Sequence, residues 1–331
     1  MRDSATNDEL ARGVIERDRT RLGRAITLVE STHPEHRARA QELLTRLLPD
    51  TGASHRIGIS GVPGVGKSTF IERFGCRLID AGHRVAVLAV DPSSSISRGS
   101  ILGDKTRMEK LAASDDAFIR PSPTGGNLGG VARTTRETIL VCEAAGFDVV
   151  MVETVGVGQS ETVVADMVDT FVLLELAGAG DELQGIKRGI LELAHIVAIN
   201  KADGTNRESA ERARAELERA LKILRPATPS DPWTPRVVLS SAVTGDGLDE
   251  IWDLVREHRR ALEETGVFDD RRDQQRVDWM WSLVDQGVLS ALRAHPDVAA
   301  IIVDVERAVS DGRTTPTAAA EKILAAFGLD R

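Results

Sequence analysis

A glycine-rich segment, GVPGVGKST at residues 61–69, constrains the fold of this chain more than any other feature of the sequence. It matches the pattern G-x-x-x-x-G-K-[ST] and lies between residues 56–60, which are typical of a strand, and the helix-compatible residues 70–74. A strand, a glycine-rich turn and a helix N-terminus together aim backbone N–H groups at phosphate oxygens. The segment therefore predicts a phosphate-binding P-loop, with nucleotide contacts expected from Gly61, Val62, Pro63, Gly64, Val65, Gly66, Lys67, Ser68 and Thr69.

Two side chains of the P-loop have expected chemical roles. We expect Lys67 to reach the β- and γ-phosphates and to act in catalysis, and the Ser68 hydroxyl to bind Mg²⁺. Gly61, Gly64 and Gly66 allow the backbone to turn tightly and to approach the ligand. The alternative is a glycine-rich turn that binds nothing, and the flanking strand and helix disfavour it.

The segment NKAD at residues 200–203 predicts the base of the nucleotide. An Asp carboxylate only accepts hydrogen bonds, so Asp203 suits the N1–H and N2–H₂ donors of guanine, neither of which adenine offers. We expect Asn200 to contact the base or to brace its loop, and the Lys201 stem to cover the ring face. Alone, N-K-x-D is more often a polar turn, but here it follows the apolar run 194–199 downstream of a P-loop, which favours GTP over ATP. The backbone amides that would face guanine O6 follow the next apolar run and belong to Ser240, Ser241 and Ala242.

Composition indicates a globular protein of one large or two modest domains, because the 331 residues are 41% hydrophobic and 28% charged. No apolar run approaches the roughly 18 residues that a membrane-spanning helix needs, and residues 1–21 lack the apolar core of a secretory signal. We therefore expect a cytoplasmic protein with no membrane partner. The net charge of −9 and the pI near 5.4 disfavour a nucleic-acid partner. Cys76 and Cys142 are isolated, which predicts reduced and unreactive thiols.

Apolar runs of strand length alternate with helical stretches from residue 56 to about residue 258. Such alternation predicts an α/β fold with a doubly wound, mainly parallel sheet and right-handed crossovers. Nucleotide loops then lie at the carboxyl ends of the strands. The predicted strands are 56–60, 84–90, 117–120, 148–153, 170–176, 195–199 and 236–240. The predicted domains are a helical N-terminal extension at 1–52, a P-loop GTPase domain at 53–260 and a helical dimerisation arm at 261–331.

The arm is predicted to be helical after a charge-rich, linker-like segment at 263–273. Helices are expected to start at Pro296 and Pro316, because proline suits the first helical turn. Trp279 and Trp281 lie outside any nucleotide loop, and they either pack a small helical core or form a dimer interface. The residues that define one apolar face of the arm are Val277, Met280, Val284, Val288 and Ala291.

Residues 147–153, FDVVMVE, have the pattern of a buried strand that ends in an acid, Glu153. This fits a Walker-B strand, and we expect Glu153 to bind Mg²⁺, through water, or to orient the attacking water. Gly156 is expected to present its N–H to the γ-phosphate. Asp91 and Asp104 flank a hydroxyl-rich loop and are candidate Mg²⁺ ligands, direct or through water, with a turn or helix-capping role as the alternative. Asp104 is also a candidate for orienting the attacking water.

Five segments together resemble the MeaB/ArgK family of P-loop GTPases: VDPSSSISRGSILGDKTRM, RPSPTGGNLGG, ETVGVGQSE, GAGDELQGIKRGI and NKADG. The resemblance covers nearly the whole chain. It implies a homodimer joined by the C-terminal arm, and kinship with metallochaperones for nickel and cobalamin. It also implies a chaperone that protects and reloads adenosylcobalamin-dependent methylmalonyl-CoA mutase through GTP binding and hydrolysis. By matching position, the residues with an implied role in the nucleotide cycle are Lys67, Ser68, Asp91, Asp104, Glu153 and Lys187.

Two alternatives to the GTPase chaperone stay open. Part of the family carries the label of a kinase linked to basic amino-acid transport, which would transfer the γ-phosphate to an acceptor other than water. The other alternative is a non-catalytic scaffold, which the complete set of phosphate, magnesium and guanine motifs disfavours. No arginine finger is identifiable, so we expect slow intrinsic GTP hydrolysis that a partner accelerates.

The histidines of the sequence carry no motif for metal or cobalamin binding. The seven histidines are scattered, and the nearest pair, His33 and His36, has a Pro34-Glu35 spacer that favours an exposed turn over a metal site. The cobalamin-binding pattern D-x-H-x-x-G is absent, because Ala53 stands where the Asp before His55 would be. We therefore expect that this chain alone does not hold cobalamin and that it acts on a partner.

Overall fold

The computed structural model describes residues 5–90, 108–121, 128–154, 160–177, 188–225, 228 and 231–329. The chain forms two compact units, Met1–Asp270 and Arg271–Arg331. The first unit contains both predicted nucleotide motifs, so its sheet positions the candidate site. The predicted division at residues 52 and 260 stays a prediction.

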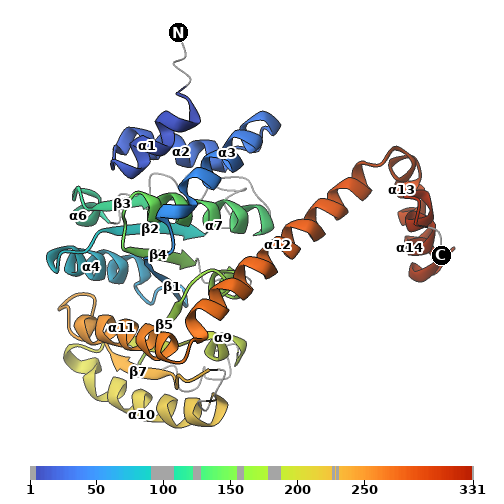
Figure 1. Ribbon diagram of the computed structural model, residues 1–331. Helices are drawn as coiled ribbons and strands as arrows, with labels where there is room; N and C mark the ends of the chain where they lie inside the picture. Colours follow the sequence, from blue (N-terminus) through green and yellow to red (C-terminus); the bar gives the residue numbers. More distant parts are fainter. Residues whose placement is uncertain are drawn as a thin grey trace. The chain divides into compact units, whose positions relative to one another are not determined.

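A parallel sheet of seven described strands forms the centre of the first unit (Figure 1). The order of the strands is β3-β2-β4-β1-β5-β6-β7, and every neighbouring pair is parallel, which confirms the predicted doubly wound α/β fold. The carboxyl ends of all these strands therefore lie at one edge of the sheet. The strands are β1 (His55–Gly61), β2 (Val85–Val90), β3 (Ala117–Arg120), β4 (Val149–Thr154), β5 (Thr170–Leu176), β6 (Ile196–Asn200) and β7 (Arg236–Leu239).

Helices cover both faces of the sheet. Alternate residues of each strand point to opposite faces, and both sets are apolar, so each face needs a covering layer. Val87, Met151 and Val172 pack in one apolar cluster with residues of α4 (Lys67–Asp80), α6 (Glu109–Ala112) and α11 (Leu248–Glu264). Leu88, Val150 and Phe171 pack on the other face with α7 (Leu128–Ala144) and α8 (Ser160–Ala165). On that second face, α9 (Arg188–Leu193) and α10 (Arg207–Leu224) cover Leu173, Val197 and Val237.

The N-terminal segment is helical, as predicted, and it contributes to the core that covers the sheet. Its helices are α1 (Asn7–Ile15), α2 (Arg19–Glu30) and α3 (Pro34–Leu47). Thr6 and Glu9 form a capping box at the start of α1, and Asp18 caps α2. Val14, Ile26 and Leu43 are fully buried in the same cluster as Leu88 and Phe171. The extension is therefore part of the packed core of the first unit.

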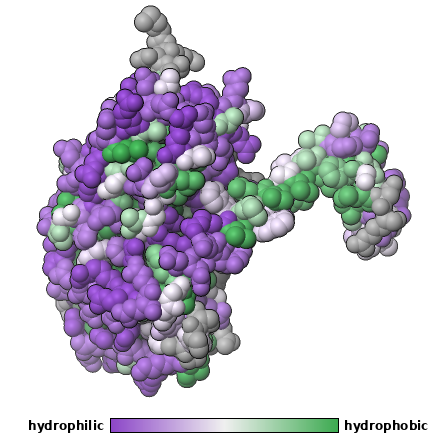
Figure 2. Space-filling view, viewed as in Figure 1, coloured by the Kyte–Doolittle hydropathy of each residue, from purple (hydrophilic) through white to green (hydrophobic). Residues whose placement is uncertain are grey.

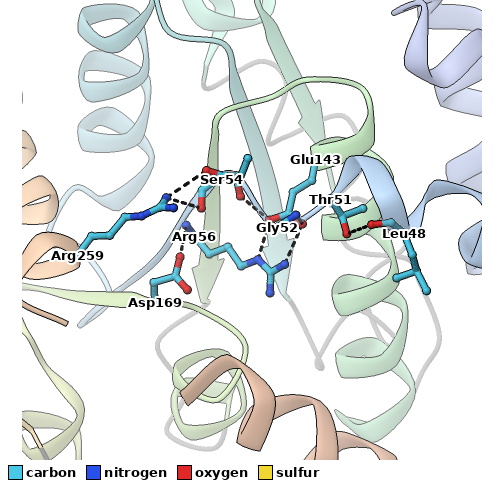
Figure 3. Close-up of polar contacts among 9 residues, drawn as sticks. Leu48, Thr51, Gly52, Ser54, Arg56, Glu143, Asp169 and Arg259 are labelled. Carbon is cyan, nitrogen blue, oxygen red and sulfur yellow. Dashed lines mark hydrogen bonds and ion pairs between the residues drawn. The ribbon is translucent and has the colours of Figure 1, made fainter. Parts of the chain in front are cut away.

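A hydrogen-bonded junction joins the extension to the amino end of β1 (Figure 3). The Glu143 carboxylate of α7 accepts hydrogen bonds from the Gly52 N–H at 3.0 Å and the Ser54 hydroxyl at 2.6 Å. It also accepts from Nε and Nη2 of Arg56, each at 2.8 Å. Arg259 of α11 donates to the carbonyl of Ser54 at 3.2 Å, and Asp169 accepts from the Arg56 N–H at 3.0 Å. The extension, α7 and α11 are thus joined to the amino end of β1, at the edge of the sheet opposite the strand carboxyl ends.

The C-terminal segment forms α12 (Val267–Ala294), α13 (Pro296–Ser310) and α14 (Pro316–Ala326), with the predicted starts at Pro296 and Pro316. The linker predicted at 263–273 is wrong, because only Thr265 and Gly266 separate α11 from α12. Gly266 takes a left-handed φ of 75° there. The Glu and Arg residues of this stretch are good helix formers, and Asp269 and Asp270 lie in the first turn of α12, where acids stabilise a helix, which explains the error. No described helix combines the length and the apolar character that crossing a membrane requires.

Apolar side chains gather along α12 (Figure 2). Val277, Met280, Val284 and Val288, which were predicted to share a face, are each between 43% and 51% exposed, and Trp281 is 57% exposed. Exposed apolar side chains that follow one helix face are typical of an interaction surface.

Candidate functional site

The P-loop connects β1 to α4 at the carboxyl edge of the sheet. Gly64 and Gly66 have φ values of 82° and 94°, in the left-handed region that favours glycine. A Cβ at Gly61 would lie 2.5 Å from the Leu174 carbonyl oxygen, so this position also requires glycine. Gly66 precedes α4 without a side-chain cap, which leaves the first N–H groups of that helix oriented toward an incoming anion. The local backbone thus has the form that phosphate binding requires.

Lys67 lies at the start of α4, and its ammonium group is directed back over the loop. Nζ donates to the Gly61 carbonyl at 2.7 Å and to the Val62 carbonyl at 3.4 Å. Burial lowers the pKa of Lys67, and the negative charges of Glu153 and Glu161 oppose this shift. The protein therefore surrounds this cation with oxygen atoms that phosphate oxygens could replace.

The predicted metal-binding hydroxyl and the predicted Walker-B acid lie together. Ser68 Oγ donates to Glu153 Oε1 at 3.4 Å. The sheet explains this approach, because Glu153 of β4 pairs with Ile59 of β1, just before the P-loop. A hydroxyl and a carboxylate are both oxygen ligands of the kind that Mg²⁺ prefers. Within the described residues, no group of three or more His, Cys, Asp or Glu side chains could hold a metal ion without other ligands.

Asn200 connects the NKAD segment, residues 200–203, to the P-loop. Its Nδ2 donates to the Val65 carbonyl at 2.8 Å, and its Oδ1 accepts from the Ala242 N–H at 3.2 Å. Lys201, in a left-handed conformation with φ 58°, donates from Nζ to the Gly64 carbonyl at 2.8 Å. These contacts match the bracing role that was one of the two expectations for Asn200. The base loop and the phosphate loop therefore form one connected structure.

Asp203 follows this brace and precedes the short helix Gly204–Asn206. Within the described residues, its half-buried carboxylate makes no capping bond to that helix. The N–H groups predicted to face guanine O6 all donate within the protein: Ser240 to Ile199 at 2.8 Å, Ser241 to Asp246 at 3.0 Å and Ala242 to Asn200 at 3.2 Å. The bond from Ala242 is the longest of these, so this N–H is the one that a base oxygen could most readily attract.

Several predicted site residues cannot be placed. Asp91, Asp104, Gly156 and Lys187 lie outside the described residues. The predicted site residues that the structure describes form two clusters. Lys67, Ser68 and Glu153 lie where the phosphates are expected, and Asn200 and Asp203 lie where the base is expected. The hydrogen bonds of Asn200 and Lys201 to the P-loop join the two clusters. Their roles in binding and catalysis stay predictions.

Two acidic residues near these loops were not singled out from the sequence. Glu161 lies in the first turn of α8 and is only 2% exposed, although it belongs to the ETVGVGQSE segment. Glu175 lies near the end of β5 and is 4% exposed, and burial raises its pKa to about 7. Glu175 lies between the ends of β1 and β6, because its neighbours Leu174 and Leu176 pair with Gly61 and Asn200. The sequence feature that could have indicated Glu175 is a glutamate within the apolar run FVLLEL, residues 171–176.

The histidine pair lies at the start of a helix, and burial affects both cysteines. His33 and His36 are exposed at the start of α3, and Ser31 Oγ lies 2.8 Å from His36 Nδ1. The start of a helix thus replaces the exposed turn that was expected. Burial raises the pKa of both thiols, Cys76 and Cys142, which keeps them in the less reactive protonated form.

Comparison with known proteins identifies the family. The family model described as methylmalonyl Co-A mutase-associated GTPase MeaB matches residues 22–297. The probable GTPase Rv1496 of Mycobacterium tuberculosis is 58% identical over 322 residues, which cover 97% of this chain and 95% of that protein. The mitochondrial methylmalonic aciduria type A homolog of Mus musculus is 49% identical over 330 residues, covering 97% and 79%.

A solved structure agrees with these relatives. The crystal structure of an LAO/AO transport system kinase superposes with a TM-score of 0.79 at 41% sequence identity, and the match covers 98% of each chain. The match to the Mycobacterium tuberculosis relative, which is named as a probable GTPase, covers 97% of the chain and so spans the regions of both nucleotide segments. This chain therefore belongs to the MeaB family and is a P-loop GTPase.

Proposed function

We propose that this GTPase is a chaperone that protects and reloads adenosylcobalamin-dependent methylmalonyl-CoA mutase. The observation that carries the proposal is the match of residues 22–297 to the mutase-associated GTPase family, which spans both nucleotide loops. The name of the mouse relative, which refers to methylmalonic aciduria, supports the same metabolic setting. We further propose a cytoplasmic location, no nucleic-acid or membrane partner, and cobalamin held only together with the mutase.

In the proposed phosphate site, Lys67 exchanges the carbonyls of Gly61 and Val62 for the β- and γ-phosphates. The P-loop amides and Lys67 then stabilise the negative charge that develops during hydrolysis. Glu153 or Asp104 orients the attacking water, and Gly156 and Lys187 complete the γ-phosphate side. Each of these groups acts by position and charge, without a covalent intermediate.

The proposed magnesium ligands are Ser68, Asp91, Asp104 and Glu153. Ser68 and Glu153 fit the ion, because their oxygens lie 3.4 Å apart and belong to the ligand types that Mg²⁺ prefers. When bound, Mg²⁺ would neutralise charge between the β- and γ-phosphates. At the other end of the site, Asp203 would accept hydrogen bonds from guanine N1–H and N2–H₂, while Ala242 donates to O6.

We also propose that the chain acts as a homodimer through residues 261–331. The half-exposed stripe of Val277, Met280, Val284 and Val288 supports this proposal, since an apolar helix face of this kind is more stable when another copy covers it. A symmetric dimer would present two GTPase units to one client.

The mutase proposal is tested by binding and turnover with the client. The full chain is mixed with the cobalamin-loaded mutase in GDP or a non-hydrolysable GTP analogue, and the complex is measured by size-exclusion chromatography. We expect the complex to depend on the nucleotide and GTP hydrolysis to rise on the order of tenfold with the mutase. A chain that hydrolyses GTP, but neither binds the mutase nor responds to it in either nucleotide state, would exclude the chaperone function.

The second candidate is a kinase linked to basic amino-acid transport, which the name of the superposed crystal structure favours. The two candidates differ in the acceptor of the γ-phosphate. Radiolabelled GTP distinguishes them, because a chaperone releases all the label as inorganic phosphate, whereas a kinase transfers part of it to a protein or small molecule.

A further inference from the structure

Two hydroxyl groups meet inside the first unit at the ends of the neighbouring strands β4 and β1. Thr154 Oγ1, in the last residue of β4, donates to Ser60 Oγ of β1 at 2.8 Å. Both residues are buried, with at most 1% of their surface exposed. Alternation along β4 places Thr154 on the face of the sheet where Val150 and Val152 pack in an apolar cluster. Because apolar side chains of the same shape could fill this space equally well, the hydroxyl pair indicates a role beyond packing.

The hydrogen bond lies directly before the P-loop. The last registered pair between β1 and β4 is Ile59 with Glu153. Ser60 and Thr154 are the next residues, and Gly61, the first residue of the P-loop, follows Ser60. At this level the registered backbone pairs of β1 are with β5 and those of β4 are with β2. The side-chain bond thus connects the ends of β1 and β4 directly.

The end of β4 carries this bond on one face and the predicted Walker-B acid on the other. Successive side chains of a strand point to opposite faces, so Thr154 and Glu153 are directed to opposite sides of the sheet. Glu153 Oε1 lies 3.4 Å from Ser68 Oγ of α4. Branching at Cβ restricts the Thr154 side chain, so its hydrogen bond also holds the backbone that carries the carboxylate.

We infer that Thr154 and Ser60 form a positioning pair for GTP hydrolysis, whose bond fixes the end of β4, and with it the Glu153 carboxylate, relative to the P-loop. This inference rests on the proposed role of Glu153 in binding Mg²⁺ or orienting the attacking water. Loss of the bond would slow the chemical step, because small displacements of a catalytic group cost rate steeply. GTP binding would change little, since the P-loop and the NKAD segment keep their own contacts.

The test removes the Thr154 hydroxyl and keeps the shape of the side chain. At saturating Mg²⁺, Thr154→Val should lower kcat for GTP hydrolysis by about fivefold to 20-fold, with KM changing by less than about twofold. Thr154→Ser, which retains the hydroxyl, should keep kcat within about twofold of the native value. Thr154→Ala removes the same hydroxyl and replaces the Val variant if thermal melting shows that the latter is unfolded. Native kcat in a folded variant without this hydroxyl would overturn the inference.

Thr170→Val is the matched control for stability. Thr170 is also a buried strand threonine, and its Oγ1 lies 2.8 Å from His258 Nδ1. It begins β5, at the opposite edge of the sheet from the P-loop. This variant should lower the melting temperature and keep kcat within about twofold of the native value. If Thr170→Val lowers kcat as much as Thr154→Val does, kcat follows stability and the inference is wrong.

A double variant tests whether the two hydroxyls act as one pair. Ser60→Ala should lower kcat about as much as Thr154→Val, and the double variant should lower it no further, because either change breaks the same bond. Additive losses would show that the hydroxyls act separately, against the inference. Glu153→Gln separates this result from the proposed site. Native kcat in Glu153→Gln would mean that the proposed role of Glu153 is wrong, whereas loss of kcat in Glu153→Gln but not in Thr154→Val overturns the positioning pair alone.

Discussion

Glu175 places a buried carboxyl group between the strands that carry the two nucleotide loops. Burial raises its pKa from 4.5 to about 7, and it forms no hydrogen bond or ion pair with another described residue. Between these pH values the unfolded chain loses the proton and the folded chain keeps it, so stability falls as pH rises from about 4.5 to about 7 and then levels off. Glu175→Gln should remove this loss and stabilise the protein by on the order of 2–3 kcal/mol at pH 8.

Urea unfolding at pH 4.5 and pH 8 measures this effect. The gain from Glu175→Gln should appear at pH 8 and be small at pH 4.5, where Glu175 is protonated in the folded chain and about half protonated in the unfolded chain. Glu250→Gln, at an exposed position, should show no such dependence. Equal gains in the free energy of unfolding at both pH values would mean that Glu175→Gln stabilises the protein through packing and not by removing an ionisable group.

Asp203 is expected to select guanine. In Asp203→Asn the acceptor oxygens facing guanine N1–H and N2–H₂ are partly replaced by an N–H₂ donor, so GTP affinity should fall by about 100-fold or more. Xanthine offers a carbonyl where guanine has its amino group, so XTP affinity should rise. Titrations with both nucleotides measure the exchange, and undiminished GTP binding would remove Asp203 from the base site.

Local motifs in the sequence were sufficient to predict Lys67, Ser68 and Glu153 at one edge of the sheet. Glu153 lies at the end of β4, Lys67 and Ser68 follow the loop at the end of β1, and parallel strands end at the same edge. The same logic could not choose between the two roles of Asn200, since its contacts to Val65 and Ala242 join segments far apart in the chain. Glu161 and Glu175 were missed for a related reason. Their burial results from the packing of helices and strands that are distant in the sequence, and a single acidic residue in the sequence does not indicate it.

Among the secondary-structure elements, the strands were predicted to within about one residue because buried parallel strands are short apolar runs. The linker at 263–273 was predicted wrongly because charged residues were read as solvent-exposed coil. Many of them lie on helices instead, where pairs such as Arg259 and Glu263, 2.7 Å apart, are compatible with helical spacing. Phe268 is buried beneath Arg259, whose guanidinium carbon lies 4.8 Å from the ring centroid.

The junction around Glu143 joins α7 and the extension to β1, so breaking it should loosen several elements together. Burial alone would raise the pKa of Glu143, but the hydrogen bonds and charge of Arg56, together with the hydrogen bonds from Ser54 and Gly52, outweigh it and lower that pKa. The two side chains are only 1% and 15% exposed. Glu143→Gln should therefore destabilise the protein by about 3 kcal/mol, because Arg56 is left buried without its counter-charge.

Urea unfolding measures the loss, and Glu263→Gln is the control. Glu263 pairs with Arg259 at 2.7 Å, but its side chain is 48% exposed, so this variant should lose less than about 1 kcal/mol. Because the junction lies at the opposite edge of the sheet from the P-loop, folded Glu143→Gln should bind GDP normally. Weakened GDP binding with unchanged stability would show that the junction acts on the nucleotide site and not on the fold.

The division of the molecule determines where the proposed dimer arm can be removed. The predicted arm begins at residue 261, but Leu262 is fully buried and Phe268 is 6% exposed, so a cut at that boundary would remove part of the first unit. A chain ending at Asp270 retains both residues and every described P-loop and guanine contact. It should be a monomer that binds GDP with unchanged affinity, whereas the full chain should be a dimer.

Light scattering and GDP titration on both lengths distinguish the possibilities. A chain ending at Ala261 serves as the comparison, and it should melt at a lower temperature because Leu262 and Phe268 no longer fill the core. A dimer that survives removal of residues 271–331 would place the contact between copies in the GTPase unit. Loss of GDP binding in the chain ending at Asp270 would show that the two units depend on each other, and the apolar face of α12 would then need a partner within the same chain.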